Sequence, residues 1–138
     1  MSFADERRAI ETRMQSNWTH SSVPIQFDNV PSHRGNPTDP WVRLTIMNGD
    51  ARVAALGNSL HRHGGLIDID VFVKENSGTA GARVYADSAA AIFKQVTLSA
   101  GSSGTIKTGV PRIVRVGARD GWYQLKVSVG YRRDESQS

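Results

Sequence analysis

Two histidines and two aspartates in one short segment are the residues of this chain that could most readily do chemistry. His61, His63, Asp68 and Asp70 are all metal-ligand types. Residues two apart on an extended segment project to the same side, so each pair could chelate one ion, as a metal-dependent nuclease or hydrolase requires. The spacing matches no zinc template and contains no helical His-Glu-x-x-His motif. Aspartates on the polar face of a strand ordinarily pair with a cross-strand cation such as Lys126. We therefore expect a structural cluster without a metal.

Other catalytic patterns are missing from the sequence. There is no Gly-x-Ser-x-Gly elbow for a nucleophilic serine. The stretch Gly101-Ser102-Ser103-Gly104 lacks the Gly-Lys-Ser/Thr ending of a phosphate-binding loop. The chain has no cysteine, which excludes thiol catalysis, disulfides and cysteine-ligated metals. We therefore expect a protein that is not an enzyme, with no catalytic residues and no cofactor.

The composition is that of one soluble domain. The chain has 138 residues, of which 38% are hydrophobic and 22% charged, and its net charge is +4. No apolar run approaches the ~20 residues of a membrane span. The acids Asp5 and Glu6 stand where a signal peptide would have its apolar core, so we expect a protein made and used inside a cell. The arginines are scattered, which argues against dedicated nucleic-acid binding.

Two segments have the periodicity of amphipathic helices. Residues 2–18 place one apolar stripe on the core side: Phe3, Ile10, Met14 and Trp18. Residues 79–95 place a second stripe rich in small side chains: Ala82, Tyr85, Ala86, Ala89, Ile92 and Phe93. Both helices are therefore expected to pack on a sheet.

The strands are predicted from alternating or β-branched runs. In chain order they cover residues 25–30, 41–47, 52–56, 67–74, 96–98, 105–107, 110–116 and 123–132. Asn48-Gly49 predicts a hairpin turn between the second and third of these. Pro111 predicts an edge position or a strand start for the region that contains it.

The elements together predict an α+β fold in a single two-layer domain, with an antiparallel or mixed β-sheet and two α-helices packed on one face. The domain is expected over residues 1–132, followed by a polar, disordered tail over 133–138. Two polar loops, Pro31–Trp41 and Gly57–Gly65, cannot add to the core, so we expect them to contact partners. Their interface-type residues are Arg34, Trp41, His61, Arg62 and His63.

The order of the pieces resembles the tail terminator-like proteins of long-tailed phages and prophages. The similarity spans residues 1 to about 132. It rests on an opening helix at residues 1–13, a short strand ending in Asn29-Val30-Pro31, the segment from Leu56-Gly57 through His61-Arg62-His63 into the following strand, and a closing strand at residues 121–129.

This resemblance implies a virion structural protein. Its subunits would form a hexameric ring at the head-proximal end of the tail, stop polymerisation of the tail tube and offer a surface for joining the head. The implied partners are other copies of the chain, the tail tube protein and head–tail connector proteins, with DNA passing through the lumen without specific binding and no membrane. Assembly would occur in the bacterial host cytoplasm. The alternatives are a head–tail connector or tail-completion protein of another type, and a metal-dependent nucleic-acid enzyme using His61, His63, Asp68 and Asp70.

Overall fold

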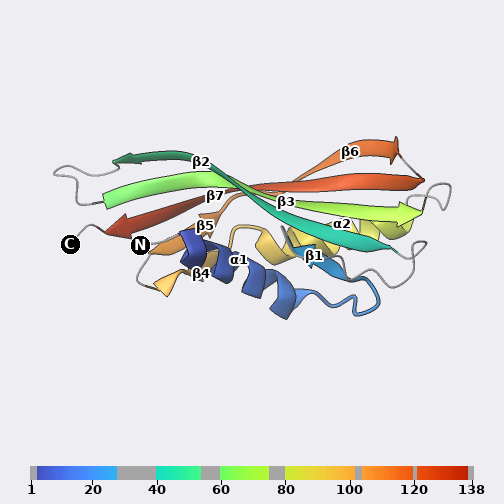
Figure 1. Cartoon of the computed structure of the whole chain (residues 1–138), viewed down its shortest axis with the longest axis horizontal. Helices are drawn as coiled ribbons and strands as arrows, with labels where there is room; N and C mark the ends of the chain where they lie inside the picture. Colours follow the sequence, from blue (N-terminus) through green and yellow to red (C-terminus); the bar gives the residue numbers. More distant parts are fainter. Residues whose placement is uncertain are drawn as a thin grey trace.

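The computed structural model describes residues 3–27, 40–53, 60–74, 80–101, 104–119 and 121–136, with the backbone alone for 50–53, 60–61, 80, 119 and 135–136. Figure 1 shows a long curved sheet with both helices beneath it. Its elements are, in chain order, α1 (Phe3–Asn17), β1 (Ile25–Phe27), β2 (Trp41–Val53), β3 (Leu60–Lys74), α2 (Ala80–Phe93), β4 (Thr97–Ser99), β5 (Thr105–Thr108), β6 (Arg112–Arg119) and β7 (Trp122–Ser136).

The sheet is organised around two long antiparallel strands. β3 and β7 pair over 15 consecutive residues, from Leu60 opposite Ser136 to Lys74 opposite Trp122, without irregularity. β2 lies on the other margin of β3, and β1 adds to β2 in parallel. The second margin of β7 is shared, because β6 pairs with its first half and β5 with its second half, and β4 pairs with β5. The sheet is therefore mixed, as predicted.

Both helices cover the same face of the sheet (Figure 1). The face of α2 that meets β3 and β7 has the fully buried alanines Ala82, Ala86 and Ala89, whose small side chains allow close approach. From α1, Ile10 and Met14 are fully buried in the same core. The predicted α+β fold, with two helices on one face of the sheet, is confirmed.

Polar side chains on the outer face of the sheet, the face opposite the helices, pair with one another. Asp70 Oδ2 lies 3.1 Å from Arg43 Nη2, and Asp70 Oδ1 accepts a hydrogen bond from Gln124 Nε2 at 2.8 Å. Asp68 Oδ2 lies 3.8 Å from Lys126 Nζ, which confirms the predicted cross-strand partner. Both aspartates are buried among these partners, although they lie on the face that the sequence predicts to be wet.

The predicted hairpin turn at Asn48-Gly49 is wrong. A type I′ turn needs positive φ at both central residues, and neither residue has it. β2 instead continues to Val53 along β3, with a register shift between Asn48 and Ala51, where two residues of β2 stand against Gly64 of β3. A Cβ on Gly49 would lie 3.2 Å from the carbonyl oxygen of Gly64, so this glycine permits close approach of two strands. Residues 54–56 of the predicted return strand lie outside the described residues.

The predicted loop over Gly57–Gly65 is also wrong from residue 60 onward. Every residue from Leu60 to Gly65 has a partner in the far half of β7, so this polar segment is the first half of β3. Gly65 lies opposite Tyr131, whose ring occupies the space that a side chain at 65 would fill. The histidines, arginine and glycines of this segment hide its strand character, because they do not alternate with apolar residues.

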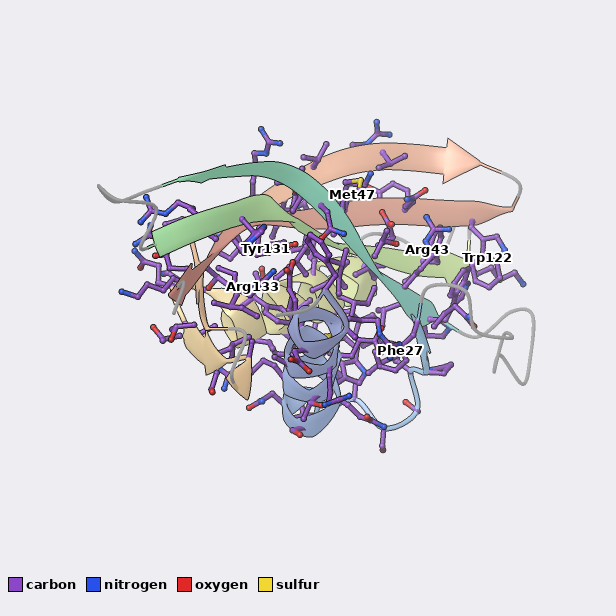
Figure 2. All side chains as sticks on the ribbon, turned by 60° about the vertical axis from the view of Figure 1, so that its left-hand side comes forward. Phe27, Arg43, Met47, Trp122, Tyr131 and Arg133 are labelled. Atoms are coloured by element: carbon purple, nitrogen blue, oxygen red, sulfur yellow. The ribbon has the colours of Figure 1, made fainter. Side chains whose placement is uncertain are left out.

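A buried polar network explains why the predicted tail at 133–138 is wrong as far as Ser136. Arg133 is 0% exposed, and its Nε donates to Glu6 Oε2 at 2.9 Å, while Tyr131 Oη donates to Glu6 Oε1. Tyr131 Oη also lies 3.0 Å from Asn48 Oδ1. Figure 2 shows Tyr131 and Arg133 pointing from the sheet toward α1. The network joins the first turn of α1 to the end of β7, so residues 133–136 belong to the sheet.

The space around Gly65 generates the first prediction. We expect Gly65→Ala to lower the free energy of unfolding by about 1–3 kcal/mol, because overpacking forces neighbours apart. The added Cβ would lie 2.7 Å from Tyr131 Oη and closer still to the carbonyl oxygen of Met47. The matched control is Gly130→Ala on β7, where a Cβ would meet nothing within 4 Å. Urea unfolding checks both variants, and an equal loss in the two would contradict the prediction.

The buried network generates the second prediction. Glu6→Gln removes the charge that faces the buried guanidinium of Arg133, and breaking a buried ion pair costs about 3–5 kcal/mol. The control is Glu11→Gln, since Glu11 pairs with the exposed Arg7 at 3.5 Å and a surface pair contributes about 0–1 kcal/mol. Denaturant midpoints of the two variants should differ accordingly. Equal midpoints would mean that the network does not hold α1 to β7.

Candidate functional site

The structure separates His63 from Asp68 and Asp70, which lie on opposite faces of β3. Successive residues of a strand point to opposite faces. On β3, His63 shares the helix-side face with Ile67 and Ile69, and its ring lies edge-on to Phe3 with centroids 5.7 Å apart. Asp68 and Asp70 lie on the outer face, each with its own cation. The register gives the backbone of His61 the same parity as His63, while its side chain is not described. Among the described residues, no three His, Asp or Glu side chains could hold one metal ion.

Arg62 forms an ion pair within the subunit. It lies opposite Asp134 in the β3–β7 register, and the guanidinium contacts both carboxylate oxygens, with Nε–Oδ1 at 2.7 Å and Nη2–Oδ2 at 3.2 Å. The hydrogen bond from Arg62 is the main cause that lowers the pKa of Asp134. The sequence predicts that Arg62 lies in a loop, which is wrong. Arg62 lies in β3 and is already paired with Asp134.

Trp41 begins β2 and belongs to an aromatic cluster on the outer face. Its ring stacks on Phe72 with centroids 4.2 Å apart and an interplanar angle of 12°, and it lies edge-on to Trp122 at 6.3 Å. The guanidinium of Arg43 lies 5.2 Å from the Phe72 ring centroid. Figure 2 shows Arg43 and Trp122 near the same end of the sheet. Arg34, the remaining predicted interface residue, lies outside the described residues.

A histidine–serine contact was missed by sequence reasoning. His20 Nε2 and Ser88 Oγ lie 2.8 Å apart, and the His20 ring is flanked by Trp18 and Tyr85, each with its centroid 5.0 Å away. The pair joins the segment after α1 to the middle of α2. No sequence pattern links residues 68 positions apart, so only the fold reveals this contact.

A groove of about 580 Å³ runs between α1 and the β4 region. Its apolar lining includes Ala9, Leu98 and Ala100. The two arginines that line it are engaged within the subunit. Arg13 Nε donates to the carbonyl oxygen of Ile92 at 3.0 Å, and Arg8 pairs with Asp5 at 3.6 Å. The groove is therefore lined by apolar surface and by arginines that already interact within the subunit.

Exposed apolar side chains gather on β6 and the residues before it. The large apolar residues exposed in the described part of the chain are Phe3, Met47, Leu66, Val84, Val110, Ile113, Val114 and Val116. Ile113, Val114 and Val116 lie on β6, and Val110 stands just before it. β6 pairs with β7 alone among the described strands and begins directly after Pro111, which agrees with the prediction of an edge position or a strand start. In the sequence, this surface is visible as a run with apolar residues at both odd and even positions. A strand with one buried face needs apolar residues at alternate positions only. Exposed apolar surface on an edge strand indicates a contact surface.

The Arg62–Asp134 pair generates a pH-dependent prediction. Because the folded pKa of Asp134 lies below its usual 3.8, the ion pair stabilises the fold above that pH, and the stabilisation is lost as pH falls through the folded pKa. We therefore expect Arg62→Gln to be less stable than the wild type at pH 7, with the difference shrinking below about pH 4. Thermal melts across pH measure it. In an Asp134→Asn background the difference should not vary with pH, and a variation there would contradict the assignment.

Comparisons with known proteins agree with this architecture. No curated protein matches the sequence. Several solved structures match the chain, and one of them has a TM-score of 0.76 and 18% sequence identity, with 100% of this chain and 99% of that one covered, which establishes a shared fold. Residues 7–131 match the family model described as phage tail terminator protein, a range that runs from α1 to Tyr131 in β7. The chain belongs to the phage tail terminator protein family.

Proposed function

We propose that the chain caps the phage tail tube as a hexameric ring at the head-proximal end of the tail, ends tube polymerisation and offers the surface for joining the head. The family match over residues 7–131 carries this proposal, since it establishes a structural role in the phage tail. The ring, the capping and the head-joining surface extend that role. The protein would assemble in the bacterial host cytoplasm and remain in the virion.

The architecture supports a structural subunit. The helices cover one face of the sheet, and the two buried aspartates of the other face form the ion pairs Arg43–Asp70 and Lys126–Asp68. The margins of the sheet remain for neighbours, and a ring needs a head-to-tail contact whose rotation closes. No helix in the described ranges combines the length and apolar character that a bilayer crossing requires.

The partners we propose are other copies of the chain, the tail tube protein and head–tail connector proteins, with DNA passing through the lumen without specific binding. The candidate contact residues remain those predicted from the sequence: Arg34, Trp41, His61, Arg62 and His63. For Arg62 and Trp41 such contacts would add to interactions made within the subunit. The aromatic and arginine side chains are of the types enriched at interfaces.

The proposal predicts closed rings at the end of tail tubes. Purified protein mixed with polymerising tail tube protein should give hexamers by native mass spectrometry and tubes with a capped end by negative-stain microscopy. Tubes should stop growing when the protein is added, because the ring occupies the growing end. The control is the same tube protein without the chain. A monomer that leaves tube growth unchanged would exclude the terminator function, and an open filament of the chain itself would indicate a tube protein.

A further inference from the structure

The side chains of β6 are uncovered on both faces of the strand. β6 pairs with β7 through one margin, and no other described strand pairs with it (Figure 1). Every residue of 112–116 is exposed. In the register with β7, Val114 lies opposite Lys126 on the outer face, and Ile113 lies opposite the buried Val127 on the helix side. An edge strand with exposed apolar side chains is a template for an added strand.

The two arginines of this stretch lie on opposite faces of β6. Arg112 lies opposite Ser128 on the outer face, and Arg115 lies opposite the buried Leu125 on the helix side. The Arg115 guanidinium lies 5.8 Å from the centroid of the Tyr123 ring. Within the described part of the chain, neither arginine forms an ion pair with an acidic side chain. β6 therefore presents one uncompensated positive charge on each face.

The spacing of the two arginines determines which partner fits. A strand that pairs with the second margin of β6 alternates its own side chains between the same two faces. Opposite charges directly across a strand pair stabilise the pairing, whereas like charges destabilise it. The complementary segment therefore has two acidic residues three positions apart, opposite Arg112 and Arg115. The two residues between them lie opposite Ile113 and Val114, so they are apolar.

This pattern favours another protein as the occupant of the edge. The 13 Asp and Glu residues of this chain include no two that are three positions apart, so a second copy lacks the complementary segment. Nucleic acid also fits poorly, because the arginines lie on opposite faces and Ile113 and Val114 would gain no apolar cover from phosphates. An acidic extended segment of a protein matches the charges, the apolar side chains and the strand edge together.

We propose that β6 accepts an added strand from a partner protein other than this chain, whose segment has Asp or Glu at two positions three apart and apolar residues between them. The carboxylates of the partner pair with Arg112 and Arg115, and its apolar side chains cover Ile113 and Val114. The inference goes beyond the proposed capping ring and does not depend on it, because it rests on the geometry and charge of β6 alone.

Two peptides of identical composition and with blocked termini test the pattern. Thr-Glu-Val-Val-Glu-Thr has its acids three positions apart, one for each face of β6, whereas Thr-Val-Glu-Val-Glu-Thr has both acids on one face. NMR titration of the full-length chain to millimolar peptide should give saturable shifts at β6 with the first peptide. The second should bind about fivefold more weakly, because it can pair with only one arginine. The first peptide should also protect amide hydrogens of β6 that do not bond to β7.

Charge reversal tests the contact from the side of the chain. The double variant Arg112→Glu, Arg115→Glu should lose binding of Thr-Glu-Val-Val-Glu-Thr and gain binding of Thr-Lys-Val-Val-Lys-Thr, which the wild type should not bind. Both arginines are exposed, so the circular dichroism spectrum and melting temperature should stay close to those of the wild type. The matched control is Arg83→Glu, an exposed arginine on α2, which should leave binding unchanged.

The outcomes separate the possible occupants. Equal binding of the two glutamate peptides, binding that survives the double reversal, or no shift at millimolar peptide would overturn the proposal. Rings that are lost in the double variant without any peptide would assign β6 to a second copy, and shifts at β6 with oligothymidylate but not with peptide would assign it to nucleic acid. Either result overturns the proposal. The ring function fails separately, when the wild type never caps tubes, and peptide binding does not depend on that result.

Discussion

The uninterrupted pairing of β3 with β7 is the constraint on which the rest of the subunit depends. Its 15 residue pairs fix two faces at once. Ile67, Ile69 and Val127 face the helices, whereas Asp68 and Lys126 face outward. A slip of one residue by either strand would send every side chain of that strand to the opposite face. Gly65 and Tyr131 help to fix the register, because the Tyr131 ring fits only opposite a residue without a side chain.

The sequence predicted well the elements whose pattern is local. Alternation over residues 67–74 and 123–131 and the alanine-rich stripe of α2 identify their own buried faces. The failures fall at the far ends of β2, β3 and β7, where glycine, histidine and arginine replace the alternation. Burial there depends on partners far away in the chain. Glu6 and Arg133 are 127 positions apart, and Arg62 and Asp134 are 72 apart, so no window of the sequence contains either pair.

The candidate contact surface, too, could be predicted from the sequence only in part. The edge position of β6 could be predicted from Pro111, and its apolar residues at both parities are visible in the sequence. The continuation of β2 beyond Met47 could not be predicted, because Asn48-Gly49 has the composition of a turn and the strand runs through it. Asp68 and Asp70 on the outer face are paired within the subunit with Lys126 and Arg43. What remains uncovered is apolar surface at the margins, and burying such surface is a dominant favourable term in association.

The central position of β7 has a consequence for how the chain folds. β7 is the last element in the sequence, yet it pairs with β3, β5 and β6 and supplies the buried partners of Glu6. The longest pairing of the sheet, between β3 and β7, therefore joins strands distant in sequence, and such a pairing slows folding because a long loop must close first. A nascent chain has its β2–β3 pair before it has the strand that completes the core. The core of the subunit is therefore complete only after β7 has been synthesised.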